Sequence, residues 1–280
     1  MKQDPDFNLI KNPKPFIKWA GGKRQLLDAI LAEANIEFNE YYEPFVGGGA
    51  LYFKLWSLGR IKKAHINDSN PDLVNAYLVI QNNVDELINE LKNEKYQNTQ
   101  NAFYKIRVEQ PTSDIEKAAR FIYLNKTGFN GLYRVNSKGV FNVPFGRYKN
   151  PKILDEQNLR LVNKALERAS ITCKDFEDAI HKANGSSLIY FDPPYHPLNG
   201  TAKFTQYTSN NFSLDDQERL SKIFARLSKG GSYVLLSNSD TEIIKQLYSG
   251  FTQTQVYANR AINCKADKRG KITELLIRSW

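Results

Sequence analysis

The chain has 280 residues, 41% of them hydrophobic, and a formal net charge of +9, which suits one large domain with an insertion and favours a polyanionic partner such as nucleic acid. Its two cysteines and three scattered histidines provide neither a disulfide framework nor the spacing of a zinc site. The polar N-terminus is unlike a signal peptide, and no segment approaches the roughly 20 apolar residues of a membrane span. We therefore expect a soluble cytoplasmic protein that holds no metal and binds no membrane.

The N-terminal part of the chain repeats one pattern, in which an extended segment leads into a glycine turn and then into a helix. The expected elements are an extended segment at 16–19, a helix at 24–35, a strand at 41–46, a helix at 50–58 and a strand at 64–68. The turns are Gly21-Gly22 and Gly47-Gly48-Gly49, and the last strand ends in Asp68.

The rest of the chain contains helices, an irregular stretch, and then strands alternating with helices. Helical spacing is found at 71–82, 84–91, 102–108, 115–125, 155–169, 214–227 and 241–248. Strands are expected at 171–173, 187–192, 233–237, 251–257 and 272–277, and no regular pattern spans 126–151. The alternation predicts an α/β fold whose largely parallel sheet is covered by helices on both faces.

The second glycine turn indicates a nucleotide-like ligand. A glycine turn before a helix presents backbone N–H groups and a positive dipole end, and an acid at the tip of the next strand typically accepts from ribose hydroxyls. Asp68 stands in that position after Gly47. Tyr52 replaces the third glycine of a dinucleotide fingerprint, so an adenosine-containing cofactor other than NAD is expected. The alternative is an ordinary tight turn with Asp68 as a helix cap.

The irregular stretch is basic and aromatic. Residues 126–154 contain six basic residues, five aromatic residues and no acid. Basic side chains neutralise phosphates, arginine can fork onto guanine, and apolar side chains can enter a base stack, so the stretch predicts a duplex DNA contact. The alternative is a solvated loop whose aromatic rings belong to the core. A second basic loop, at 258–271, is either a clamp for backbone phosphate or a solvated hairpin.

Asp192-Pro193-Pro194-Tyr195 directly follows an apolar run at 188–191 and indicates chemistry on an amino group of a flat base. Prolines stiffen the loop, and their carbonyls remain free to accept hydrogen bonds. Asp192 and the Pro193 carbonyl are the two expected acceptors for the amino group, and Tyr195 is expected to stack on the base after it leaves the duplex.

Five blocks, in their order along the chain, resemble the Dam-type DNA adenine-N6 methyltransferases, also described as the D12 class or group alpha. They are Pro15-Phe16-Ile17-Lys18-Trp19-Ala20-Gly21-Gly22-Lys23, Glu43-Pro44-Phe45-Val46-Gly47-Gly48-Gly49, Asn67-Asp68, the insertion with Asn125-Lys126-Thr127-Gly128-Phe129-Asn130-Gly131-Leu132-Tyr133-Arg134 and Phe141-Asn142-Val143-Pro144-Phe145-Gly146-Arg147-Tyr148, and Asp192-Pro193-Pro194-Tyr195. The resemblance implies a Rossmann-like methyltransferase sheet that uses S-adenosylmethionine. Residues 1–70 and 155–280 would form the catalytic domain, and 71–154 an inserted, mainly helical DNA target-recognition domain.

The resemblance and the motifs together give two sets of candidate residues besides the catalytic Asp192, Pro193 and Tyr195. The candidates for cofactor binding are Trp19, Lys23, Glu43, Phe45, Gly47, Gly49, Asp68, Phe176 and Asp192. Those for DNA binding are Lys18, Phe129, Asn130, Leu132, Arg134, Asn142, Pro144 and Arg147. Phe176 is expected either to stack on the cofactor adenine or to belong to the core. Phe129 lacks the hydroxyl that a tyrosine would bring to this position.

The expected function is methyl transfer to N6 of an adenine flipped out of double-stranded DNA, with GATC as the site that the resemblance implies. Two alternatives stay open: a catalytically idle DNA-binding protein on the same scaffold, and an amino-methyltransferase with another target sequence or base. A functional pairing with a restriction endonuclease also stays open, and we expect a monomer on DNA.

Overall fold

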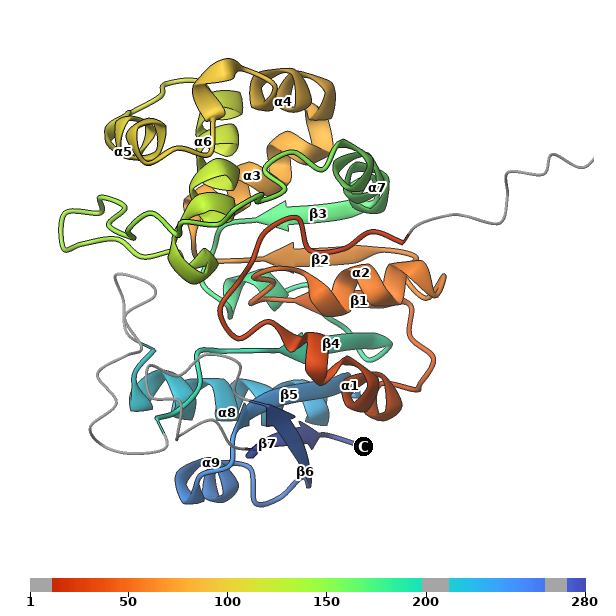
Figure 1. Ribbon diagram of the computed structural model, residues 1–280. Coiled ribbons are helices and arrows are strands. Elements are labelled where there is room, and N and C mark those ends of the chain that lie inside the picture. Colours follow the sequence, from red (N-terminus) through yellow and green to blue (C-terminus); the bar gives the residue numbers. More distant parts are fainter. Residues whose placement is uncertain (1–11, 198–211, 260–270) are drawn as a thin grey trace, which may run out of the picture.

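A seven-stranded mixed sheet forms the centre of the computed structural model, which describes residues 12–197, 212–259 and 271–280 (Figure 1). The strands are β1 (Glu40–Glu43), β2 (Ala64–Asn67), β3 (Ala169–Thr172), β4 (Ser187–Phe191), β5 (Tyr233–Ser239), β6 (Thr252–Asn259) and β7 (Lys271–Arg278). Their order is β3-β2-β1-β4-β5-β7-β6. The first five are parallel, and β7 runs antiparallel to both β5 and β6. The predicted α/β class with a largely parallel sheet is confirmed.

Helices cover both faces of this sheet, as predicted. They are α1 (Leu27–Glu33), α2 (Ala50–Ser57), α3 (Pro71–Asn82), α4 (Val84–Leu91), α5 (Gln100–Val108), α6 (Asp114–Thr127), α7 (Glu156–Leu166), α8 (Leu214–Lys229) and α9 (Glu242–Leu247). Figure 1 shows α3 to α6 gathered at the β3 end of the sheet. No helix in the described ranges has the length and apolar character needed to cross a membrane.

The sheet separates two hydrophobic clusters because successive strand residues point to opposite faces. In β4, Leu188 and Tyr190 belong to a cluster with side chains of α2, α3 and α7. Ile189 and Phe191 belong to the other cluster, with side chains of α8 and α9. All five residues of β4 are buried, which explains why its sequence is a continuous apolar run rather than an alternating one.

Local signals placed most helix boundaries within a few residues. The predicted helices at 71–82 and 84–91 coincide with α3 and α4, and the side chain of Asn70 caps α3. The predicted helix at 24–35 is shorter, because a 3-10 turn at Lys23–Gln25 precedes α1. The predicted extended segment at 16–19 joins no strand. Its backbone instead bonds to Asn125 of α6, which accepts from Lys18 N at 2.8 Å and donates to Lys18 O at 2.7 Å.

The stretch that lacked a regular pattern is an irregular hairpin. Antiparallel bridges join Gly128 to Phe145 and Val135 to Phe141. A 3-10 turn at Phe129–Gly131 follows α6 directly, and Gly139 adopts a positive φ of 74° near the tip. The hairpin is therefore ordered by two bridges rather than by a continuous ladder.

Candidate active site

The ligand crevice is expected where the strand order reverses, beyond the carboxyl ends of β1 and β4. Asn67, the last residue of β2, connects the loop after β1 to the loop after β3 through hydrogen bonds of its side chain. Its Nδ2 donates to the carbonyls of Pro44 and Lys174, both at 3.0 Å. Its Oδ1 accepts from Lys174 N at 2.9 Å and from the Thr172 hydroxyl at 2.8 Å. Sequence reasoning gave Asn67 no role, because its partners lie far along the chain.

The glycine turn after β1 is closed by Asp68. The carboxylate of Asp68 accepts from Gly47 N at 3.0 Å and from Asn70 N at 2.9 Å. Asp68 is 8% exposed, and burial raises its pKa to about 6, although these backbone hydrogen bonds oppose the rise. The cap of α3 is Asn70, not Asp68, so the helix-cap alternative is wrong for this acid.

Both outer glycines of the turn occupy positions that a side chain would not fit. Gly47 has φ of 47°, and a Cβ there would lie 2.6 Å from Cδ1 of the Trp19 indole. Gly49 has φ of 69°, and its Cβ would lie 2.7 Å from the Tyr77 hydroxyl. That hydroxyl donates to Gly47 O at 3.0 Å. The predicted cofactor-binding residues Trp19, Gly47 and Gly49 are thus brought together with Asp68.

Asp192 follows β4 at the same edge of the sheet. Its Oδ1 lies 2.7 Å from the Lys23 ammonium and accepts from the Ser237 hydroxyl at 2.9 Å. The Ser237 hydroxyl is itself 2.9 Å from that of Tyr190. Burial raises the pKa of Asp192, and the charge of Lys23 opposes that rise. Lys23 therefore stabilises the ionised carboxylate.

Tyr195 faces the same ammonium. Lys23 Nζ lies 4.6 Å from the centroid of the Tyr195 ring, and the Tyr195 hydroxyl donates to Glu274 of β7 at 2.6 Å. The carbonyl of Pro194 accepts from Gln217 at 3.0 Å. The expectation that both proline carbonyls stay free is therefore wrong for Pro194, because α8 packs a buried amide against it.

Glu43 lies in the interior beside these groups. It is 3% exposed and accepts from the Tyr41 hydroxyl at 2.9 Å. Burial raises the pKa of Glu43 well above its usual range, and the hydrogen bond from Tyr41 opposes that rise. Glu43 is thus held inside the protein.

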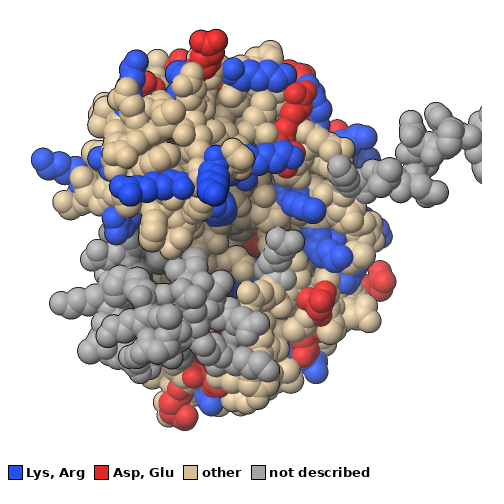
Figure 2. Space-filling view, in the orientation of Figure 1, with Lys and Arg blue, Asp and Glu red and all other residues tan. Residues whose placement is uncertain are grey.

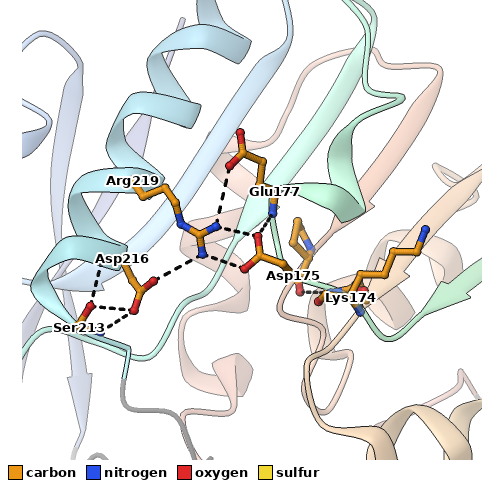
Figure 3. A network of polar contacts seen from close by, with 8 residues as sticks. Lys174, Asp175, Glu177, Ser213, Asp216 and Arg219 are labelled. Atoms are coloured by element: carbon orange, nitrogen blue, oxygen red, sulfur yellow. Dashed lines mark hydrogen bonds and ion pairs between the residues drawn. The ribbon is translucent and has the colours of Figure 1, made fainter.

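Phe45 and Phe176 meet in an aromatic cluster. Their ring centroids are 5.4 Å apart, and Phe212 lies 5.7 Å from each of them. Phe176 is 5% exposed and has the Arg219 guanidinium over its ring at 4.1 Å. Figure 3 shows this guanidinium beside Asp175 and Glu177 of the loop after β3 and beside Asp216 of α8. Phe176 thus belongs to the hydrophobic core, which confirms one of its two predictions, and its contact with the cofactor stays a prediction.

The predicted DNA-binding residues lie on the hairpin and on the segment beside it. Phe129 is 49% exposed, whereas Leu132 is half-buried. Asn130 and Arg147 are exposed with positive φ, and the Pro144 carbonyl accepts from Phe129 N at 2.9 Å. Lys18 is exposed. Figure 2 shows a row of Lys and Arg side chains across the middle of the face in view.

Four of the five aromatic residues of the insertion pack against other side chains instead. Tyr133 donates to Asp72 at 2.5 Å, and Phe141 is 7% exposed. Phe145 lies 5.4 Å from Phe103, and Tyr148 has Lys18 Nζ 4.1 Å above its ring. The core alternative is correct for Tyr133, Phe141 and Phe145, whose rings pack on the hydrophobic core, whereas Tyr148 is half-buried beneath the Lys18 ammonium.

Two further expectations concern metal binding and the second basic loop. In the part of the chain that the structure describes, no group of three or more His, Cys, Asp and Glu side chains could hold a metal ion. Most of the basic loop at 258–271 lies outside the described residues.

Comparisons with known proteins agree with this geometry. Residues 19–262 match the sequence model of the D12 class N6 adenine-specific DNA methyltransferases. The chain is 47% identical to the type II methyltransferase M.MjaIII of Methanocaldococcus jannaschii, over 95% of this chain and 99% of that protein. It is 42% identical to the type II methyltransferase M1.LlaDCHI of Lactococcus lactis, over 96% of each. It is 38% identical to a DNA adenine methylase of Vibrio cholerae, over 95% of this chain and 96% of that protein.

The similarity to solved structures is too weak to support an argument about this chain. The match to a putative RNA methyltransferase from Pyrococcus horikoshii covers 96% of this chain and 89% of that protein, with 10% identity and a TM-score of 0.39.

The sequence matches extend over nearly the whole chain and include every motif at the carboxyl edge of the sheet. The methyltransferase family implies S-adenosylmethionine as the cofactor. The chain therefore belongs to the D12 class of N6 adenine-specific DNA methyltransferases.

Proposed function

We propose that this enzyme transfers a methyl group from S-adenosylmethionine to N6 of an adenine flipped out of double-stranded DNA, within the sequence GATC. The observation that carries the proposal is the contact of Asp192 with Lys23, beside the ring of Tyr195. A fixed carboxylate next to an aromatic ring suits a flat base that carries an amino group. The cofactor, when bound, supplies an electrophilic methyl group on a sulfonium.

Asp192 acts on the amino group of the base. The N6 lone pair is delocalised into the adenine ring, so the site must favour a pyramidal amine with its lone pair directed at the methyl group. Lys23 and Ser237 both contact Oδ1 of Asp192, and we assign Oδ2 to one N6–H and the Pro193 carbonyl to the other. These acceptors stabilise the positive charge that develops on N6 as the N–C bond forms and the S–C bond breaks. N6 loses a proton afterwards.

Tyr195 stacks on the flipped base, and Phe129 fills the gap that the base leaves in the duplex. Extruding a base costs a few kcal/mol, and stacking on an aromatic ring recovers part of it. The Tyr195 hydroxyl is fixed by Glu274, so the ring is oriented before the base arrives. Phe129 is the exposed aromatic residue of the hairpin and fills the space in the duplex. Stacking needs no hydroxyl, so phenylalanine suffices there.

The loops after β1, β2 and β3 would hold the cofactor. Trp19, Gly47 and Gly49 would border it, and Asp68 would accept hydrogen bonds from the ribose hydroxyls. Phe45 and Phe176 would border the adenine. Residues 71–154 form the inserted target-recognition domain, whose hairpin enters DNA. The other residues, 1–70 and 155–280, form the catalytic domain.

Cofactor binding should weaken in acid because of Asp68. An ionised carboxylate is the stronger hydrogen-bond acceptor, and the pKa of Asp68 is about 6. The acid is protonated below that pH, so we expect the Kd for S-adenosylmethionine to rise as the pH falls through about 6. Calorimetric titrations between pH 5 and 8 measure this. Asp68→Asn should bind weakly at every pH in that range. A wild-type Kd that does not change with pH would contradict the role of Asp68.

Guanine discrimination is expected to depend on Arg134. Its Nε donates to Asn142 Oδ1 at 2.7 Å and its Nη2 to Asn142 O at 3.3 Å. The opposite edge of the guanidinium can donate two hydrogen bonds, one to O6 and one to N7 of guanine. Arg134→Ala should lower the preference for guanine over other bases at one position of the site by about 10- to 100-fold. Asn142→Ala should act at the same position but less strongly.

The matched control is Lys138→Ala, an exposed cation near the tip of the same hairpin. It should weaken binding to all duplexes alike, without changing the preference. Relative kcat/KM on duplexes substituted at one position at a time gives the answer. If Arg134→Ala also lowers activity on every duplex equally, Arg134 is a phosphate contact and not a reader of guanine.

The relatives suggest a cellular setting. Two of them are named type II methyltransferases, so we propose that this enzyme is paired with a restriction endonuclease of the same site and acts in the cytoplasm as a monomer on DNA. Host DNA should then resist cleavage by an endonuclease that cuts only unmethylated GATC. Complete cleavage of that DNA would exclude the pairing.

The decisive test of the proposed function uses labelled S-adenosylmethionine and matched duplexes containing GATC, GTAC or neither. Label in N6-methyladenine on the GATC duplex alone is the expected result. Label on all three duplexes would retain the reaction and refute the GATC assignment, and label in N4-methylcytosine would identify another target base. DNA binding without any label would identify an idle scaffold.

A further inference from the structure

Arg219 of α8 reaches across to the loop that follows β3 and holds its acids. Its Nη1 donates to Asp175 Oδ1 at 3.0 Å and its Nη2 to Asp175 Oδ2 at 2.8 Å. Nη1 also lies 3.9 Å from Glu177 Oε2. Figure 3 shows the two parallel contacts to Asp175. The pairing is bidentate, a geometry that arginine forms and lysine cannot.

The same guanidinium covers the aromatic ring between those two acids. Arg219 Cζ lies 4.1 Å from the centroid of Phe176, while Phe45 and Phe212 pack against the same ring. An arginine that pairs with an acid and stacks on the adjacent ring fixes both the loop and the orientation of the ring. Phe176 is 5% exposed, so these contacts fix the orientation of its ring.

The position of Arg219 on its helix is also fixed. Its Nη2 lies 3.5 Å from Asp216 Oδ1, and Asp216 forms a capping box with Ser213 at the start of α8. The side chain of Arg219 therefore joins the N-terminus of α8 to the loop after β3. At the other end of that loop, Asn67 holds Lys174 through two hydrogen bonds. Phe176 thus lies on a short loop that is held from both ends.

We propose that Arg219 is a positioning residue for the cofactor: it holds Phe176 in the orientation that accepts the purine ring, and so sets the affinity for S-adenosylmethionine without taking part in methyl transfer. The inference rests on the proposed function, because it takes the purine to lie beside Phe45 and Phe176. Arg219 has 40% of its side chain exposed, so its ion pairs alone contribute little to stability. Its contribution is the preorganisation of the ring, which lowers the cost of ordering the loop on binding.

The test compares Arg219→Ala, Arg219→Lys, Phe176→Ala, the double variant and Arg226→Ala. Arg226 is the matched control. It also belongs to α8, and its Nη1 lies 3.0 Å from Oε1 of Glu177 in the same loop. The guanidinium over the Phe176 ring is that of Arg219 and not that of Arg226. Calorimetry gives the Kd for S-adenosylmethionine and for S-adenosylhomocysteine. Steady-state assays at saturating cofactor give kcat and the KM for DNA. Thermal unfolding verifies that each variant is folded.

The expected result is a Kd about tenfold higher for Arg219→Ala, equivalent to about 1.4 kcal/mol, with kcat and the KM for DNA within about twofold of wild type. Arg219→Lys should recover part of the affinity, and Arg226→Ala should bind as wild type does. The double variant should bind no more weakly than Phe176→Ala, because Arg219 acts only through that ring.

Three outcomes would overturn the proposal: an unchanged Kd in Arg219→Ala, an additive loss in the double variant, or an equal loss in Arg226→Ala. An unchanged Kd in Phe176→Ala would overturn it as well, by removing the purine from this ring. A wild-type protein that binds the cofactor but does not methylate DNA would refute the proposed function and leave the assignment of Arg219 standing.

Discussion

Asp192→Ala is expected to lower kcat for methyl transfer by about 10³-fold or more, because it removes an acceptor that stabilises the charge developing on N6. The carboxylate is anchored through Oδ1 by Lys23 and Ser237, which fixes the position of this acceptor in the folded protein. Specific DNA binding should remain, since the contacts that we propose with DNA come from the hairpin. Single-turnover rates of N6-methyladenine formation measure the loss.

Asp192→Ala also leaves the Lys23 ammonium without its carboxylate partner, and an unpaired ammonium with a side chain only 8% exposed destabilises the fold. Asp192→Asn retains the shape and one acceptor, and it separates this effect from the chemistry. We expect it to fold with near wild-type thermal stability and to lose most of its activity. Asp215→Ala, which removes an exposed acid in the first turn of α8, is the control and should be fully active. A fast Asp192→Asn enzyme would show that the charge of Asp192 is unimportant.

Lys23→Ala should have the second largest effect, a loss of about 10²-fold in kcat at pH 7, as for the removal of one preorganised charged group. Burial already raises the pKa of Asp192, and the ammonium opposes that rise. Without Lys23 the pKa rises further, so a smaller fraction of Asp192 is ionised at neutral pH. The acid limb of the kcat profile should therefore move to higher pH, and part of the lost activity should return as the pH is raised.

Lys23→Arg retains the positive charge and should leave the acid limb close to that of wild type. Lys63→Ala is the matched control, because Lys63 also pairs with a carboxylate at 2.7 Å, that of Glu40, but is 58% exposed. Its pH profile should be unchanged. A Lys23→Ala enzyme whose acid limb stays in place would show that Lys23 contributes through cofactor contact alone.

The sequence predicted the parts of the fold that local chemistry specifies. Pro71 and the capping Asn70 start α3 where the spacing predicted it, and the apolar run of β4 is buried on both faces. Asp68 directly follows β2, as predicted for an acid at the tip of that strand. These features depend on backbone conformation and strand period, which neighbouring residues determine.

The same sequence could not place the side chains that complete the site. The Tyr195 hydroxyl is held by Glu274, 79 residues away, and Lys174 is held by Asn67, 107 residues away. Which residues meet across these separations depends on strand order and register, and no local period encodes either. For the same reason three aromatic rings of the insertion, those of Tyr133, Phe141 and Phe145, pack on the core, whereas Phe129 is exposed.

The sequence by itself thus determined the family, most of the strand and helix pattern, and the candidate residues for the chemistry. Only the tertiary structure decided which groups act on them: Lys23 and Ser237 on Asp192, Gln217 on Pro194, and Arg219 on the loop of Phe176. The physical reason is that a residue's type and its neighbours fix its intrinsic chemistry, whereas its pKa and orientation depend on burial and on partners that only the folded chain brings within contact distance.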